Sequence, residues 1–415
     1  MHVCMVLGHT YPPDVRIKKE AKALVGAGHE VTLLCRGRSD EPTRETVHGM
    51  QVVRLHTDTP LETAARYASA ACNLVANIHP RWVRALTELV RETGADAIHV
   101  HDLPLVREGE LVGRRTDVPV VADLHENYPE AIRQWRQPHT PSSLARDPLV
   151  AIRWAFKPTW RYRRIERRCV RDVERVVTVT EEAERHYQRD CAVLPHRTQV
   201  VSNTVDCDMF DAETATPKPG YEDEFVVGYV GTFGAHRGLD IAIAAMSHLL
   251  ETVPNARLLL VGAGPDPYES GLREAAEAAG VADRVTFTGW VDFDEFPSYM
   301  ATCDVCLVPH ADTPHTNTTV PHKLFQYMAL GKPVLVTDLP PLQRVVDDAD
   351  SGVVVPAGDA DAMGGALAAL GTDERELARL GKNGRRAVEE RYNWERDGGR
   401  LVDLYEQLGE TTEST

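Results

Sequence analysis

Short apolar runs alternate along the chain with longer stretches in which apolar residues recur at helical spacing. In the first half, a helical pattern fills 14–28, and strand-like runs occupy 2–8, 29–37, 95–102, 118–125 and 173–180. In the second half, a helical pattern fills 239–253, and strand-like runs occupy 225–233, 256–264, 284–291, 303–310, 333–338 and 352–358. Strand and helix patterns that alternate in this way predict parallel, doubly wound sheets.

The length of the chain predicts two domains. At 415 residues it is too long for one ordinary core. We place the join near "VVSNTVDCDMF", which precedes a polar segment containing proline, and predict domains at 1–205 and 206–390. A helix over about 391–409 can pack back on the first domain through an apolar face, and 409–415 reads as a frayed tail. That face carries Trp394, Leu401, Leu404 and Tyr405.

Composition excludes several classes of protein. The net charge of -16 argues against a general nucleic-acid binder. No apolar run is long enough for a membrane-spanning helix, and the start "MHVCMVLGHTYPP" lacks the basic region of a signal peptide. Eight scattered cysteines in mostly apolar runs indicate reduced, buried thiols and a cytoplasmic location. The Cys303–Cys306 pair reads as part of a buried strand, and the glycines at 231, 234 and 238 lack the dinucleotide-binding spacing.

Several ordered motifs together resemble glycosyltransferase family 4 over nearly the whole chain. They are "PPDVRIKKEAKAL", "HVHD", "DLHENYPE", "VVSNTVD", "GTFGAHRGLDIAIAAM", "LLLVGAGPD", "RVTFTGWV", "PHKLFQYMALGKPVLVTD" and "SGVVVPAGDADAM". The resemblance implies an α/β protein of the GT-B fold, with two Rossmann-like doubly wound domains facing a central cleft. It also implies metal-independent transfer of a sugar, with retention, from a nucleotide-diphosphate-sugar to a glycan or lipid-linked acceptor. A nucleotide-sugar 2-epimerase and a non-catalytic GT-B subunit remain alternatives.

A cation at the mouth of a helix predicts an anion site. Pro321 suits the first turn of a helix, and Lys323 adds a positive charge where the helix dipole is already positive. The segment Asn317–Val320, with Thr318 and Thr319, offers backbone amides and hydroxyls. A leaving diphosphate needs such groups. The resemblance adds Arg237 as a second phosphate ligand.

The donor side departs from the family pattern at three positions. The family's two glutamates, separated by seven residues, correspond to Thr318 and Gln326, and an arginine often found after the first glycine of its loop corresponds to Thr232. Gln326 can still hydrogen-bond a ribose hydroxyl. The remaining donor-side candidates are small or apolar positions, namely Gly231, Gly262, Gly264 and Val320.

The first half contributes polar residues at strand ends. The resemblance places His125 at the transferred sugar, with Asp123 orienting it and Glu126 beside it. His101 and Asp102 end the previous strand and are candidates for the acceptor side. A metal is not expected, because His99 and His101 share a strand face without a third ligand nearby.

The loop after the first strand holds the other acceptor-side candidates. Gly8 allows a ligand to approach the backbone closely. Asp14 and Arg16 could bind acceptor hydroxyls or pair with each other. The segment Arg153–Asp172 is basic and aromatic, so it can lie on an anionic membrane surface or be a core helix with a solvated basic face.

Overall fold

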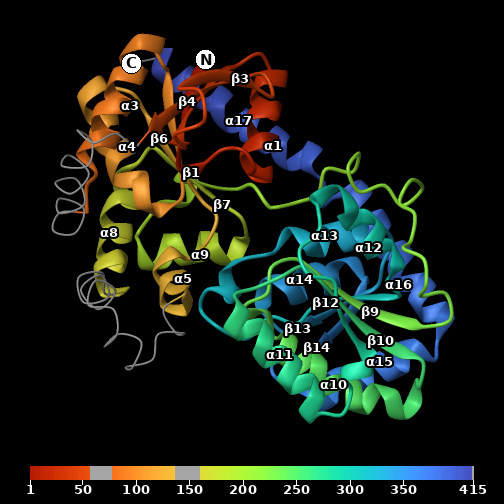
Figure 1. Cartoon of the computed structure of the whole chain (residues 1–415). Coiled ribbons are helices and arrows are strands. Elements are labelled where there is room, and N and C mark those ends of the chain that lie inside the picture. The colour runs from red at the N-terminus through yellow and green to blue at the C-terminus, as the bar shows by residue number, and fades with distance from the viewer. Residues whose placement is uncertain (57–76, 136–158, 414–415) are drawn as a thin grey trace, which may run out of the picture. The chain divides into compact units, whose positions relative to one another are not determined.

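The computed structural model describes residues 1–56, 77–135 and 159–413. These residues form two compact units. Unit 1 comprises Met1–Ser202 and Asp397–Thr415, and unit 2 comprises Asn203–Arg396 (Figure 1). Each unit is built on a single sheet with helices on both faces, as the alternating pattern predicts.

Unit 1 contains an eight-stranded sheet. Its strands run in the order β3 (Arg44–Val47), β4 (Met50–His56), β2 (Glu30–Gly37), β1 (His2–Thr10), β5 (Ala97–His101), β6 (Val120–Leu124), β7 (Arg175–Thr178) and β8 (Thr198–Val200). All neighbours are parallel except β3, which pairs antiparallel with β4. The expectation of a purely parallel sheet is therefore wrong at this edge. His48 and Gly49 both adopt positive φ, as a two-residue hairpin turn requires.

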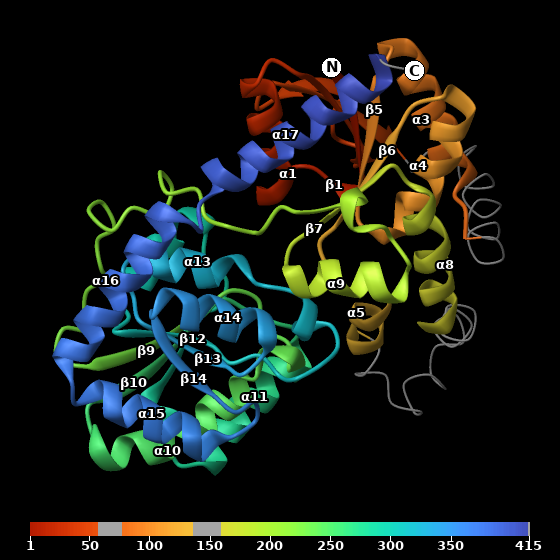
Figure 2. The ribbon, with the colours of Figure 1, turned by 180° about the vertical axis from the view of Figure 1, so that it is seen from behind.

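The helices of unit 1 cover two faces of that sheet. One core is shared by the strands and four helices, namely α3 (Pro80–Thr93), α4 (Leu103–Thr116), α8 (Thr159–Asp172) and α9 (Glu181–Asp190). The opposite face carries α1 (Val15–Gly26) and α17 (Trp394–Glu413) (Figure 2). The C-terminal helix predicted from its apolar face is confirmed, and Leu401, Leu404 and Tyr405 are buried. It continues to Glu413, so the expectation of a frayed tail from residue 409 is wrong up to that residue.

Unit 2 contains a six-stranded sheet in which every neighbouring pair is parallel. Its order is β11 (Val285–Phe287), β10 (Ala256–Val261), β9 (Phe225–Val230), β12 (Val305–Val308), β13 (Val334–Thr337) and β14 (Gly352–Val355). One face packs against α10 (Leu239–Thr252), α11 (Asp266–Ala278) and α15 (Ala360–Gly371). The other packs against α12 (Phe296–Thr302), α13 (His322–Ala329), α14 (Pro340–Ala349) and α16 (Glu374–Glu390).

Each sheet has a point where the strand order reverses. In unit 1 this point lies between β1 and β5, and in unit 2 it lies between β9 and β12. The loops that leave the carboxyl ends of such strand pairs diverge, which makes these positions the usual ligand sites of open α/β sheets. Most candidate residues from the sequence lie on these loops and on the helices that follow them.

The described cysteines are free thiols, and all except the half-buried Cys207 are buried, as expected. Cys303 and Cys306 lie in the core of unit 2, which confirms their interpretation as parts of a buried strand region. No helix within the described ranges has both the length and the apolar character needed to cross a bilayer.

Candidate functional site

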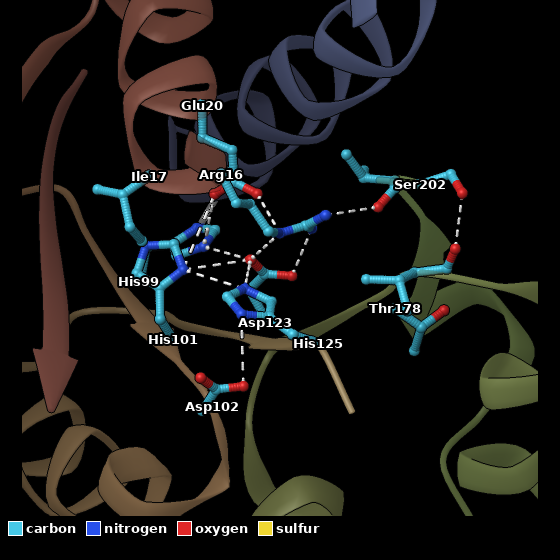
Figure 3. Close-up of polar contacts among 12 residues, drawn as sticks. Arg16, Ile17, Glu20, His99, His101, Asp102, Asp123, His125, Thr178 and Ser202 are labelled. Carbon is cyan, nitrogen blue, oxygen red and sulfur yellow. Dashed lines mark hydrogen bonds and ion pairs between the residues drawn. The ribbon is translucent and has the colours of Figure 1, made fainter. Parts of the chain in front are cut away.

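A buried polar network occupies the reversal point of unit 1 (Figure 3). It joins four elements, because its members come from the start of α1, the carboxyl ends of β5 and β6, and α17. The members are Arg16, Glu20, His99, His101, Asp102, Asp123, His125 and Tyr405. Asp123 is fully buried and is the centre to which most of the others bond.

Arg16 compensates the buried negative charge of this network. Its Nε and Nη2 donate to the two carboxylate oxygens of Asp123 at 3.0 and 2.8 Å, and Nε lies 2.8 Å from Glu20 Oε1. Although burial alone would raise the pKa of Asp123, Arg16 and His125 hold that pKa well below its ordinary value. Arg16 is only 4% exposed, so its charge interacts with buried carboxylates and not with solvent.

The two sequence alternatives for Asp14 and Arg16 therefore need correction. They do not pair with each other, because Asp14 Oδ1 caps α1 by accepting from Ile17 N at 3.0 Å. Buried Arg16 donates to Asp123 and to Val201 O, so its guanidinium is not presented to an acceptor hydroxyl. Half-buried Asp14 also lies 3.6 Å from His9 Nε2 and stays a candidate for the acceptor side.

His125 and Asp102 are members of the network that reach the surface of unit 1. His125 Nε2 lies 2.7 Å from Asp123 Oδ2, and His125 Nδ1 lies 3.4 Å from Asp102 Oδ1. Burial lowers the pKa of His125, but the carboxylates of Asp102 and Asp123 outweigh burial and hold it well above the ordinary value. The ring is therefore a cation with 19% of its side chain exposed, and a ligand can contact it there.

Asp102 is held in a strained conformation beside His125. Its φ of 62° and ψ of 153° belong to a region that is nearly exclusive to glycine. It precedes α4 without capping that helix, and its carboxylate faces His125 instead. Backbone strain of this kind clusters at functional sites, which supports the choice of Asp102 as a candidate.

His101 lies deeper than expected. It is 1% exposed, and its Nδ1 contacts Asp123 Oδ2 at 3.2 Å and His125 Nε2 at 3.4 Å. The expectation that His101 lines a ligand cleft is therefore wrong, because its side chain is buried and contacts Asp123 and the ring of His125. Burial and the neighbouring His99 lower the pKa of His101 to about 3, so the ring is neutral.

The reason given from sequence for excluding a metal here is also wrong. Ligand atoms of Glu20 and Asp123 converge with those of His99 and His101 within 4.8 Å of one another. Arg16 already pairs with both carboxylates, however, and a divalent cation would share that space with a fixed guanidinium charge. Repulsion from that charge disfavours a divalent cation here, although Glu20 Oε1 and Oε2, His99 Nε2 and His101 Nε2 are buried without a hydrogen bond to a described residue.

The other two candidates of unit 1 lie at the same end of the sheet. Glu126 is half-buried, and its backbone oxygen accepts from Tyr187 Oη at 3.4 Å. Gly8 lies within β1, and a methyl group added there would meet Leu105 at 3.6 Å, an ordinary contact. Packing within unit 1 therefore does not require glycine at position 8.

In unit 2, the loops after β9 and β10 meet at the carboxyl end of the sheet through their glycines. Gly231 and Gly262 have φ of 134° and 123°, and a Cβ at position 262 would lie 2.2 Å from the Gly231 carbonyl oxygen. A Cβ on Gly264 would lie 2.7 Å from the Cβ of Phe233. These positions exclude side chains, which brings the backbones after β9 and β10 into direct contact.

Lys323 points into this junction. Its Nζ lies 3.5 Å from the centre of the Tyr229 ring and would be 2.8 Å from a Cβ placed on Gly231. Burial lowers the pKa of Lys323 well below its ordinary value, and the positive charge of Arg237 lowers it further. The cation–π contact with the Tyr229 ring compensates part of the cost of burying the Lys323 ammonium.

Arg237 lies beside Lys323 and is held by a residue that sequence reasoning missed. It ends a short 3-10 turn, Ala235–Arg237, and its Nη1 lies 3.0 Å from His310 Nε2. Since a guanidinium only donates, the imidazole must accept through an unprotonated Nε2. Burial and the charges of Arg237 and Lys323 lower the pKa of His310 well below its ordinary value, which keeps it neutral. From sequence, His310 could have been chosen because it ends the predicted strand 303–310.

Neither cation has an acidic partner. Within residues 1–56, 77–135 and 159–413, no carboxylate forms an ion pair with Lys323 or Arg237. Arg237 Nε is buried without a hydrogen-bond partner in that part of the chain. Two adjacent uncompensated cations at a strand-order reversal form an anion site.

The remaining donor-side candidates surround the start of α13. Thr232 is exposed, Val320 and Gln326 are buried, and the hydroxyls of Thr318 and Thr319 bond to the His315 carbonyl oxygen. The structure corrects two expectations. Pro321 precedes the helix as its N-cap and is not in the first turn. The amides of Asn317 and Thr318 are bonded to carbonyls of the preceding turn and are not free.

Two Rossmann-like units with this pair of sites define the class of GT-B glycosyltransferases, and the comparisons agree. Residues 15–209 match the family model "Glycosyltransferase Family 4", and residues 211–387 match "Glycosyl transferases group 1". The chain belongs to glycosyltransferase family 4. It is a transferase that uses nucleotide sugars, and the resemblance inferred from the motifs is confirmed.

Relatives and solved structures agree with this assignment. The chain is 23% identical to the alpha-D-kanosaminyltransferase of Streptomyces kanamyceticus over 72% of its own length and 73% of that protein. It is 31% identical to a GDP-mannose-dependent phosphatidylinositol monomannoside mannosyltransferase of Mycolicibacterium smegmatis, over 45% of its length and 48% of that protein. The fold matches sucrose-phosphate synthase of Thermosynechococcus elongatus with a TM-score of 0.77, at 21% identity and 99% coverage of each chain.

Proposed function

We propose that this glycosyltransferase binds the diphosphate of its nucleotide-sugar donor in unit 2, through Lys323 and Arg237. It transfers the sugar, with retention of anomeric configuration, to a hydroxyl of a glycan or lipid-linked acceptor. The observation that carries the proposal is the pair of cations that lacks a carboxylate partner among the described residues. The side-chain-free contact of Gly231 and Gly262 opens the backbone beside them to a ligand.

The chemistry of the leaving group explains why cations are needed. As the glycosidic bond breaks, negative charge develops on the diphosphate, and preorganised donors stabilise it best in a site that excludes water. Lys323 and Arg237 supply this charge, so the reaction as proposed needs no metal. His310 contributes by fixing the Arg237 guanidinium through the 3.0 Å contact.

In the transfer step, the acceptor hydroxyl attacks the anomeric carbon on the face from which the diphosphate leaves. The bond from that carbon to the phosphate oxygen breaks, the bond to the acceptor oxygen forms, and the acceptor proton passes to the leaving phosphate. For His125, whose charge is sustained by Asp102 and Asp123, we propose a contact with the transferred sugar. A trapped covalent glycosyl-enzyme would contradict this mechanism.

Thermal shift with nucleotides tests the donor site. A ligand that binds only the folded protein raises the unfolding midpoint by mass action. We expect one of UDP, GDP, ADP, dTDP and CDP to stabilise the wild type, to stabilise Lys323→Ala much less, and to stabilise the exposed control Lys382→Ala fully. Equal shifts in all three proteins would place the diphosphate elsewhere.

Turnover assays separate this function from the alternatives. A 2-epimerase would interconvert donor sugars without an acceptor, whereas the proposed transferase releases the nucleotide diphosphate in proportion to product formed on an acceptor. A non-catalytic subunit would do neither.

A membrane surface is the proposed location of a lipid-linked acceptor. On α8, Trp160 is 65% exposed and lies beside the exposed Arg163, Arg164, Arg167 and Arg168. This face suits anionic headgroups. Tyr162, expected to share the face, is buried instead, and Trp154 and Phe156 lie outside the described residues.

Co-sedimentation with anionic liposomes tests this contact. Binding should fall when Arg161, Arg163, Arg164, Arg167 and Arg168 become glutamine. Unchanged binding would contradict the membrane contact and would leave the proposal for the donor site as it stands.

A further inference from the structure

Three side chains with metal-binding chemistry meet between α8 and α9, in a part of unit 1 that the transferase site does not use. They are Glu166 on α8, His186 on α9, and Cys191, which directly follows α9. A carboxylate oxygen, an imidazole nitrogen and the thiol sulfur lie within 4.8 Å of one another. Glu166 and Cys191 are 2% and 3% exposed, so the cluster is internal.

Glu166 is unusual for the face of α8 on which it lies. The buried residues of that helix are otherwise apolar or weakly polar, namely Tyr162, Ile165, Cys169 and Val170. A glutamate is almost never this buried unless it is paired. Within the described ranges, its one ion-pair contact is His186, whose Nε2 lies 3.8 Å from Glu166 Oε1. That separation is too long for a hydrogen bond.

Both facing atoms lack a partner. Glu166 Oε1 and His186 Nε2 are each buried without a hydrogen bond to any described residue. Leaving such groups unsatisfied inside a protein is costly. An ion between them would satisfy both, since zinc–oxygen and zinc–nitrogen bonds of about 2.0 Å each span a gap of about 4 Å or less.

The orientation of His186 also matches that of a metal ligand. Its Nδ1 lies 2.8 Å from Asp190 Oδ2. A carboxylate only accepts, so Nδ1 donates, and in the neutral ring Nε2 then presents its lone pair toward Glu166 and Cys191. Metal-bound histidines typically donate their other N–H to a carboxylate in this way, which fixes the tautomer and the ring.

We propose that Glu166, His186 and Cys191 bind one zinc ion, with water as the fourth ligand. A thiolate combined with an imidazole selects zinc over magnesium or calcium. Cys191 loses its thiol proton to solvent as the zinc–sulfur bond forms, so the two anionic ligands balance the charge of the ion. The ion would tie the end of α9 to α8, and its water-bound fourth position stays open, as in zinc sites built from three protein ligands.

The cluster around Glu20 and Asp123 does not fit as well. There the guanidinium of Arg16 already occupies the centre of the charged groups. In the α8–α9 cluster, no described arginine or lysine forms an ion pair with Glu166. The α8–α9 cluster is therefore the one that a divalent cation would complete.

Metal content and cobalt absorption test the site. We expect wild-type protein, grown with zinc and dialysed, to carry one zinc per chain. After the metal is removed, Co²⁺ should give the near-ultraviolet charge-transfer band of a cobalt–thiolate bond. Folded wild-type protein that carries no zinc and shows no cobalt band would overturn the proposal.

Variants distinguish this site from zinc on surface histidines. Cys191→Ser should abolish the cobalt band, whereas Cys169→Ser, which changes a buried thiol on α8, should keep it. Asp190→Asn changes a side chain that is 57% exposed and should weaken zinc binding about tenfold or more through His186. A band that survives Cys191→Ser would contradict the assignment. Circular dichroism confirms that each variant is folded.

Discussion

Lys323→Met should make the ligand-free protein more stable while it weakens donor binding. The ammonium of Lys323 is compensated in the structure by the Tyr229 ring at 3.5 Å and lies near the like charge of Arg237. Methionine keeps the length of the side chain and its contact with the ring. The substitution therefore removes charge with little change in packing.

The expected magnitude follows from two opposing terms. Loss of the cation–π contact costs about 1 kcal/mol. Removal of a partly buried, uncompensated ammonium gains about 2 kcal/mol, a value reduced from the full burial penalty because Lys323 is only half-buried. The net gain of about 1 kcal/mol corresponds to a rise of about 2–4 °C in the unfolding midpoint of a unit of this size.

The pH dependence gives a second check of the same reasoning. The folded-state pKa of Lys323 lies below its unfolded value, so at low pH both states are protonated and the folded state carries the full penalty. The penalty falls as pH rises through the folded pKa, because the unfolded chain then binds more protons. The advantage of Lys323→Met should therefore shrink toward pH about 10.

Differential scanning calorimetry over a pH series, with and without the stabilising nucleotide, measures all of these effects. The nucleotide-dependent shift of Lys323→Met should be smaller than that of the wild type. A variant that is less stable than the wild type at neutral pH, yet keeps the full nucleotide shift, would refute an uncompensated phosphate-binding cation.

Three further substitutions probe the two sites. His310→Ala removes the hydrogen-bond acceptor of Arg237, and we expect donor KM to rise about tenfold, from a loss of about 1.5 kcal/mol, in steady-state kinetics. Asp123→Asn removes the carboxylate that accepts two hydrogen bonds from buried Arg16 and leaves it the pair with Glu20, so urea unfolding should show a loss of about 3–5 kcal/mol. Gly262→Ala forces a methyl group to within 2.2 Å of a carbonyl oxygen at φ 123°, so nucleotide thermal shift should be lost or the protein destabilised by at least about 1–3 kcal/mol. Wild-type behaviour in any of these assays would contradict the contact concerned.

The pattern of apolar runs was sufficient to predict most of the fold, for a physical reason. Strands of a parallel sheet are covered on both faces, so they appear as continuous apolar runs that local sequence can show. The β3–β4 hairpin was missed because an edge strand of the pattern "RETV" is largely exposed and carries little apolar signal. The turn of this hairpin was also hard to recognise from sequence, because it needs a positive φ at His48, which is not a glycine.

The polar networks were harder to predict than the strands. Arg16 and Glu20 lie four residues apart on a helix, a spacing that commonly marks a solvated ion pair, and both are buried. Their partner Asp123 is more than a hundred residues away, and Tyr405, which bonds His99 at 2.6 Å, is some three hundred away. Only tertiary structure reveals such partners. The family resemblance identified His125 but not the groups that hold its charge.

The two strand-order reversals differ in how they treat positive charge, and that difference indicates where an anion binds. In unit 1, Arg16 and His125 are each matched by carboxylates, so these two positive charges are compensated without a ligand. In unit 2, Lys323 and Arg237 meet neutral groups, an aromatic ring and an imidazole, and burial lowers the pKa of that lysine. A protein that only needed stability would compensate these charges as unit 1 does. Leaving Lys323 and Arg237 without carboxylate partners is favourable when a doubly negative ligand binds between them. A nucleotide diphosphate is such a ligand.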